Sequence, residues 1–191
     1  MKDFELFDVS TAPLEAKPIL AKTQEEFKMI PNLERTMALA PALLEAYSTA
    51  WSLFSQTSLS PAEQQVVYQL SNFENECNYC VPWHTMLSLQ SGMSAQDADA
   101  LRNGRRLSTA RLEGLRCFTQ ALLWSKGRIV QADLDAFYEA GYTSRHALEV
   151  VLGIAIKVMS NYTNSIAGTP LDKVVQKYKW VKPIIKQREQ S

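Results

Sequence analysis

The sequence is poor in glycine and cysteine, and it carries no excess of either charge. Seven glycines in 191 residues lie well below the usual ~7%, so the chain is expected to spend little of its length in turns, which favours helices. The 20 basic and 20 acidic residues cancel, and this balance gives no reason to expect nucleic acid or a membrane surface as a partner. Three cysteines are too few for a disulfide framework.

We expect neither an export signal nor a membrane-spanning segment. Asp3, Glu5 and Asp8 stand where a secretory signal carries basic and then apolar residues. The apolar stretch 150–159 is interrupted by Lys157 and is shorter than the ~20 residues that a bilayer requires. We therefore expect a cytoplasmic protein, in a compartment where closely spaced cysteines more often carry redox or metal chemistry than structural disulfides.

Composition and periodicity predict one helical domain with two extensions. The first 31 residues are rich in proline and show no sustained period, so an extended arm is predicted over 1–31. Apolar residues then recur at helical intervals, as at Tyr47 and Trp51, and predict an all-α domain over 32–172. The basic segment 173–191 is interpreted as a solvated tail.

The helical region contains a weak internal repeat. Ser60 followed by Glu63 resembles Ser108 followed by Glu113, roughly 48 residues further along the chain. A helical duplication and a chance likeness between two capped helices explain this equally well.

The passage from Cys77 to His84 carries the chemistry. Cysteines three residues apart in a helical turn can bring their sulfurs within bonding distance, so Cys77 and Cys80 can alternate between dithiol and disulfide. His84 falls on the same helix face. Pro82 keeps the backbone hydrogen bonds intact only in a first turn, which predicts a helix start near 77–80. The positive end of that helix lowers a cysteine pKa from its ordinary ~8.5.

The motif Cys77-x-x-Cys80-x-x-x-His84 resembles the core motif of the alkyl hydroperoxidase D-like and carboxymuconolactone decarboxylase superfamily. The likeness covers about residues 30–172 and is closest to the peroxidase-related branch. The segments that carry it outside the motif are Pro31-Asn32-Leu33, Leu59-Ser60-Pro61, Gly92-Met93-Ser94 and Gly168-Thr169-Pro170. The resemblance implies a compact multi-helix bundle, homo-oligomeric assembly, and cysteine-based peroxidase or disulfide reductase activity with no bound cofactor or metal.

The resemblance also implies roles for the residues of the site. Cys80 would attack a small organic hydroperoxide, Cys77 would resolve the product to a disulfide, and His84 would shuttle the proton. A protein or thiol reductant of unknown identity would restore the dithiol. The family's relay commonly begins at a glutamate twelve residues before the first cysteine, where this chain has Gln65. We predict that Glu74 takes its place and orients His84.

Other interpretations of the cysteines stay open. Zinc would need a fourth ligand beyond Cys77, Cys80 and His84, and the thiols could be inert. A redox-responsive interaction protein would form the disulfide without turnover, and a carboxymuconolactone decarboxylase-type lyase would not need the cysteine pair. Cys117 is predicted to be a buried, inert core residue, and His146 to lie at the surface or cap a helix.

Overall fold

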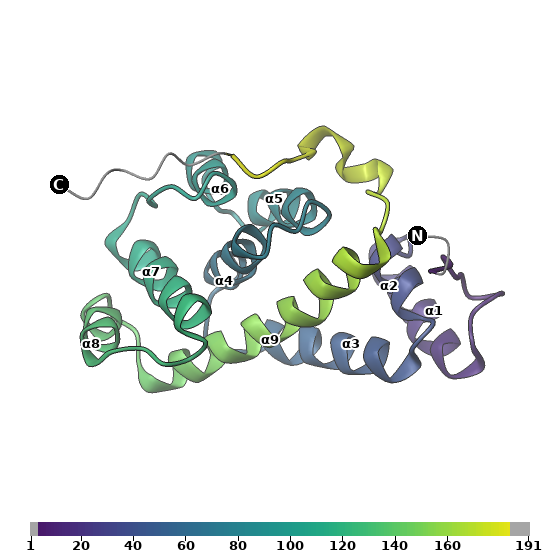
Figure 1. Ribbon diagram of the computed structural model, residues 1–191, viewed down its shortest axis with the longest axis horizontal. Coiled ribbons are helices and arrows are strands. Elements are labelled where there is room, and N and C mark those ends of the chain that lie inside the picture. Colours follow the sequence, from purple (N-terminus) through teal and green to yellow (C-terminus); the bar gives the residue numbers. More distant parts are fainter. Residues whose placement is uncertain (1–3, 184–191) are drawn as a thin grey trace.

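The computed structural model describes residues 4–183, and within that range it contains helices and no strand (Figure 1). This confirms the predicted all-α class. The α-helices are α1 (Lys17–Phe27), α2 (Asn32–Met37), α3 (Pro41–Ser55), α4 (Pro61–Glu74), α5 (Cys80–Gln90), α6 (Ala95–Arg102), α7 (Ala110–Ser125), α8 (Gln131–Glu139) and α9 (Ser144–Ala167), with 3-10 helices η1 (Leu14–Ala16) and η2 (Lys173–Tyr178). No helix of residues 4–183 is both long and apolar enough to cross a bilayer.

Helix α4 is the centre of the bundle. Every residue from Glu63 to Phe73 is buried, because α5, α7 and α9 pack around this helix (Figure 1). Its start follows from the sequence: the backbone N–H of Ser60 donates to the Glu63 carboxylate at 2.8 Å, and the Ser60 hydroxyl accepts from the Glu63 backbone N–H at 3.3 Å. This reciprocal capping box fixes where the central helix begins.

Gly153 allows α9 to approach α3 and α4 closely. A Cβ at this position would lie 2.7 Å from Cγ1 of Val67 and 2.8 Å from Cζ of Phe54. Both neighbours are fully buried, so neither has room to retreat. The missing side chain therefore sets the depth at which α9 packs.

The segment predicted as an extended arm is instead partly helical. Residues 14–27 form η1 and α1, and Ala16 and Leu20 are fully buried against the rest of the fold. The prediction was wrong because Pro18 lies in the first turn of α1. A proline there costs no backbone hydrogen bond, so it is compatible with a helix.

Part of the predicted basic tail also packs against the bundle. Trp180 is 6% exposed and its ring lies 6.0 Å from that of Phe73. Arg102 of α6 donates to the carbonyl oxygens of Tyr178 and Lys179. The remainder of that prediction, residues 184–191, lies outside the described residues.

The helix order of the two halves agrees with a repeat. Helices α4, α5 and α6 are followed about 50 residues later by α7, α8 and α9, although α9 is much longer than α6. The order alone leaves duplication and chance equally open.

Replacing Gly153 by Ala should destabilise the protein by about 1 to 3 kcal/mol, because overpacking outweighs the ~1 kcal/mol that alanine gains over glycine in a helix. Urea unfolding monitored by circular dichroism measures the change. Ala155→Ser, at an exposed position of the same helix, should stay within about 0.5 kcal/mol of the parent. A Gly153→Ala protein as stable as the parent would show that this contact does not limit the packing of α9.

Candidate active site

The two cysteines of the motif lie on either side of a helix start. Cys80 is the first residue of α5, as Pro82 predicted, and Cys77 lies in the preceding turn. Glu76 makes this turn possible by adopting a left-handed φ of 54°. The backbone N–H of Cys80 donates to Cys77 Sγ at 3.2 Å, and both thiols are buried and reduced. The helix start thus brings both sulfurs to its positive end.

The surroundings of the two sulfurs give them opposite character. Burial raises the pKa of Cys80, but a hydrogen bond from the Cys77 thiol, the Lys157 charge and the amides of Asn161 and Asn164 outweigh burial and lower this pKa to about 6. The Asn164 amide donates to Cys80 Sγ at 3.2 Å. The shared hydrogen bond and burial raise the pKa of Cys77 far above its ordinary value. At neutral pH, Cys80 is therefore a thiolate and Cys77 a thiol.

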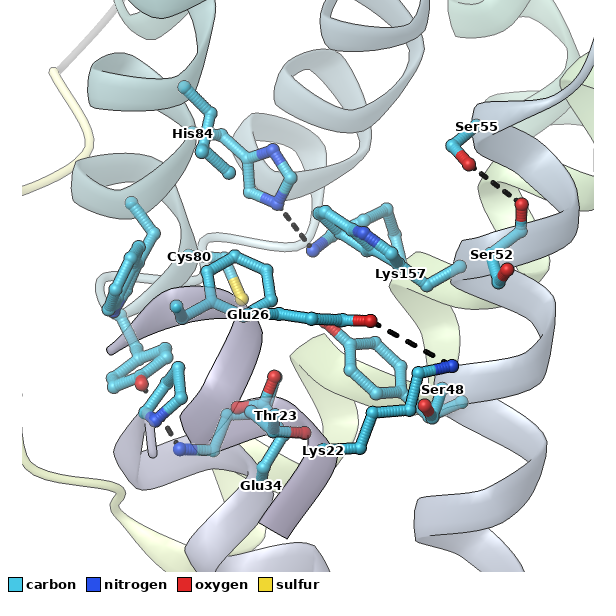
Figure 2. Close-up of a pocket in the computed structure, with 18 residues that line it drawn as sticks. Lys22, Thr23, Glu26, Glu34, Ser48, Ser52, Ser55, Cys80, His84 and Lys157 are labelled. Atoms are coloured by element: carbon cyan, nitrogen blue, oxygen red, sulfur yellow. Dashed lines mark hydrogen bonds and ion pairs between the residues drawn. The ribbon is translucent and has the colours of Figure 1, made fainter. Parts of the chain in front are cut away.

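His84 is held at both ring nitrogens. Its Nδ1 lies 2.8 Å from Oε1 of Gln65. Its Nε2 lies 3.0 Å from Nζ of Lys157 (Figure 2). A carbonyl oxygen only accepts, so Nδ1 carries the hydrogen and Nε2 accepts from the ammonium group. Burial and the Lys157 charge hold the pKa of His84 well below its ordinary range. The imidazole is therefore neutral.

Lys157 is the charged group at the centre of the site. It is 1% exposed, and no carboxylate of residues 4–183 forms an ion pair with it. Its Nζ lies 5.5 Å from the centre of the Tyr68 ring. A buried ammonium needs a compensating negative charge, and the Cys80 thiolate supplies one.

Lys157 was not predicted as a site residue, because in the sequence it only interrupts an apolar stretch. A usable signal was present, because positions 153, 157, 161 and 164 recur at helical spacing and share one face of α9. That face carries Gly153, Lys157, Asn161 and Asn164, all of them buried. A lysine is rarely buried without a partner for its charge, so a lysine in the middle of a buried face indicates a functional site.

Glu74 does not contact His84, contrary to its predicted role. Its carboxylate accepts from Nε2 of Gln120 at 2.8 Å and from Nε1 of Trp124 at 2.9 Å, both on α7. Glu74 lies nine residues after Gln65 on α4, which at 3.6 residues per turn is the opposite face of the helix. Gln65, where the resemblance to the family led us to expect a glutamate, is the residue that contacts the histidine, and it does so through its side-chain amide.

The remaining candidate residues lie away from the site. Cys117 is exposed rather than buried as predicted, and it contacts Glu113 and Arg116 on its own helix. His146 caps α9, as predicted, by accepting from the backbone N–H of Thr143 at 3.0 Å. The described residues hold no group of three or more His, Cys, Asp or Glu side chains arranged to bind a metal ion.

A cavity of about 250 Å³ opens beside Cys80 (Figure 2). Helices α2, α5 and α9 contribute its reactive side, and the serines of α3 face Cys80 from the other side. The lining side chains with most bearing on chemistry are Glu34, Tyr47, Trp51, Cys80, Trp83, His84 and Lys157. Cys77 does not line the cavity, so a small molecule inside it meets Cys80 first.

Asp172 fastens the start of α5 to the rest of the site. Its carboxylate accepts from the Tyr79 hydroxyl, from Nε1 of Trp83 at 3.0 Å and from the backbone N–H of Asn32 at 3.2 Å. These bonds join α5 to the start of α2 and to the segment after α9. The start of α5, beside Cys80, is thereby fixed to both of these segments.

No protein-family model matches the sequence, and no curated protein matches it. Solved structures match over nearly the whole chain. One is an uncharacterized peroxidase-related protein of Ralstonia eutropha JMP134, described as an alkylhydroperoxidase AhpD core, with a TM-score of 0.81 and 18% identity over 90% of this chain and 93% of that one. The chain has the AhpD-like fold.

Two further structures agree with this fold. A peroxidase-related protein of Silicibacter sp. TM1040 gives a TM-score of 0.76 with 20% identity, over 91% of this chain and 92% of that one. The debrominase Bmp8 gives 0.76 with 16% identity, over 93% and 96%. The resemblance drawn from the cysteine motif is thus confirmed as a matter of fold.

Replacing Lys157 by Met should raise the pKa of Cys80 from about 6 toward the ordinary ~8.5 of a free cysteine, because the positive charge facing the thiolate is lost. The ultraviolet absorbance of the thiolate, titrated against pH, measures this shift.

Lys173→Met, at an exposed position, is the matched control and should leave the titration unchanged. A Lys157→Met protein that titrates like the parent would show that Lys157 does not stabilise the Cys80 thiolate.

Proposed function

We propose that the protein is a thiol-dependent, peroxidase-like oxidoreductase that reduces small organic hydroperoxides through a Cys77/Cys80 dithiol–disulfide cycle. The observation that carries this proposal is the difference between the two sulfurs. Cys80 has a pKa of about 6 and lines the cavity, whereas Cys77 keeps its proton and lies behind it. The names of the peroxidase-related structural neighbours support an enzyme of this kind.

The first half of the cycle is attack by the thiolate. The Cys80 sulfur takes the terminal oxygen of the hydroperoxide, so an S–O bond forms, the O–O bond breaks and the alkoxide leaves. The alkoxide takes up one proton to become an alcohol. Sulfur is oxidised by two electrons and the peroxide is reduced by two.

The second half resolves the sulfenic acid. The Cys77 sulfur attacks Cys80, its thiol proton leaves with the hydroxyl as water, and the disulfide closes. A protein dithiol or small thiol then returns two electrons and two protons. A reducing compartment such as the cytoplasm supplies such reductants, which is where we place the activity.

The contacts of His84 support a positioning role rather than the proton shuttle expected from the motif. Its Nε2 accepts from Lys157, and Gln65 holds the opposite nitrogen. The neutral ring therefore orients the ammonium group toward the cavity. Lys157 in turn stabilises the Cys80 thiolate before attack.

Adding a slight excess of cumene hydroperoxide to the reduced protein should consume one peroxide per chain and remove two hydrogen atoms in mass, mapped to a Cys77–Cys80 disulfide. Cys80→Ser should abolish consumption. Cys77→Ser should still consume one equivalent and accumulate a sulfenic acid, which dimedone traps.

The control for both variants is Cys117→Ser, which should behave like the parent. If peroxide remains untouched and only strong general oxidants close the disulfide, the peroxidase proposal fails and a redox-responsive interaction protein is favoured.

We also propose that a second copy of the chain covers an apolar surface between α7 and α9. Trp124, Val151 and Tyr162 line one shallow hollow there and are 68%, 50% and 58% exposed. Apolar side chains clustered in this way are typical of a subunit interface. The homo-oligomer predicted from the family resemblance has a suitable surface in this patch.

Replacing Val151 and Tyr162 together by Lys should therefore convert the oligomer to monomer in sedimentation velocity, because two charges would be buried at the interface. Leu14→Lys changes a residue that is 77% exposed in η1, remote from this patch in sequence, and should leave the mass unchanged. A parent protein that sediments as a monomer would rule out this assembly.

A further inference from the structure

The proposed peroxide step leaves one chemical requirement unassigned. A departing alkoxide is strongly basic, so its release is accelerated when an acid protonates it during bond cleavage. His84 cannot supply that proton, because its Nδ1 hydrogen is directed to Gln65 and its Nε2 accepts from Lys157. The acid must therefore be a group other than His84.

Glu34 of α2 has the required placement. It lines the same cavity as Cys80 and Lys157 (Figure 2). Its Oε2 is buried and has no hydrogen-bond partner among the described residues. A buried carboxyl oxygen without a partner is costly in a folded protein, and a bound substrate oxygen would satisfy it. Glu26, the other carboxyl group that lines the cavity, is solvent-exposed and paired with Lys22.

We infer that Glu34 is the catalytic acid that protonates the leaving alkoxide when Cys80 attacks a hydroperoxide in this cavity. The inference rests on the proposed function and adds to it. A protonated carboxyl group donates one hydrogen bond, so Glu34 would donate to the peroxide oxygen that carries the organic group, which is the oxygen that leaves. The preferred class is an alkyl or aryl hydroperoxide with its organic group directed toward the aromatic walls.

The electrostatics of the cavity agree with this role. Burial, assisted by Asp172 and the Cys80 thiolate, raises the pKa of Glu34 to about 8, although a hydrogen bond to its own backbone and the Lys157 charge act in the opposite direction. The titratable groups around it are Tyr79 just before α5, Cys80 of α5, Tyr47 of α3, Lys157 of α9, Asp172 after α9, and Lys22 and Glu26 of α1. At neutral pH Glu34 is therefore mostly a carboxylic acid.

The attack of Cys80 on the peroxide lowers the pKa of Glu34 and so favours release of the Glu34 proton. The negative charge on Cys80 is one cause of the raised pKa of Glu34. When that charge moves from sulfur to the departing oxygen, this contribution disappears and Glu34 becomes a stronger acid. Cys80 thiolate, hydroperoxide and protonated Glu34 thus become Cys80 sulfenic acid, alcohol and Glu34 carboxylate, which regains a proton from solvent.

Glu34→Gln tests the assignment, because glutamine keeps the shape and a hydrogen-bond donor but has no proton to transfer. With cumene hydroperoxide, whose leaving group is a basic alkoxide, single-turnover oxidation should slow by about 10²- to 10⁴-fold. With peracetic acid, whose leaving group is a weakly basic carboxylate, the rate should change less than about tenfold, because that leaving group needs little protonation. Glu34→Asp retains the acid and should recover part of the cumene hydroperoxide rate.

Glu45→Gln, at an exposed position of α3, is the matched control and should react with both oxidants like the parent. If Glu34→Gln keeps the parent rate with cumene hydroperoxide, or loses both rates equally, Glu34 is not the acid. If the parent protein itself does not react with cumene hydroperoxide, the proposed function fails instead. An unreactive parent protein thus refutes the proposed function, whereas the rates of Glu34→Gln test the assignment of Glu34 alone.

Discussion

The site depends on one buried positive charge that forms no ion pair with any carboxylate of residues 4–183. Lys157 lies inside the bundle and is hydrogen-bonded to a neutral imidazole at 3.0 Å. In the proposed mechanism, the negative charge that compensates it is the Cys80 thiolate. Moving an ammonium group out of water costs several kcal/mol unless it is compensated. Ionisation of Cys80 is therefore favourable, because the thiolate compensates the buried charge of Lys157. The Lys157 charge helps to keep His84 neutral and to lower the pKa of Cys80, whereas Glu34 keeps its proton chiefly because it is buried.

The scaffold determines how deep that charge lies. Gly153 and Lys157 are one helical turn apart on the same buried face of α9, and the close contact at Gly153 brings that face against Phe54 and Val67. Gln65, two residues before Val67 on α4, holds the histidine that accepts a hydrogen bond from Lys157. Packing and chemistry thus share the same few turns of α4 and α9.

The starts of two helices could be predicted from residues close to them in sequence. The helix start at Cys80 follows from Pro82, and the start of α4 follows from Ser60 and Glu63, because capping and proline sterics act within a few residues. The helical class and the fold also followed from periodicity and the cysteine motif. The helix α1 was missed because a proline in a first turn looks the same in sequence as a proline in an irregular arm.

The site was predicted only as far as the motif extends. Cys77, Cys80 and His84 are close in sequence, whereas Lys157 and Glu34 reach the cavity, and Gln65 reaches His84, from three other helices. Such convergence depends on tertiary packing, so proximity in sequence wrongly favoured Glu74 over Gln65 as the partner of His84. Cys117 was assigned to the core from its residue type, but its helix presents that position to solvent.

The central claim is that a hydroperoxide meets a Cys80 thiolate and a protonated Glu34 in the same cavity. The most direct measurement is the second-order rate constant of the reduced protein with cumene hydroperoxide as a function of pH, followed by intrinsic tryptophan fluorescence. The rate should rise through about pH 6 as Cys80 loses its proton and fall through about pH 8 as Glu34 loses its own. A rate that rises only near the ordinary cysteine pKa of ~8.5 would contradict the account.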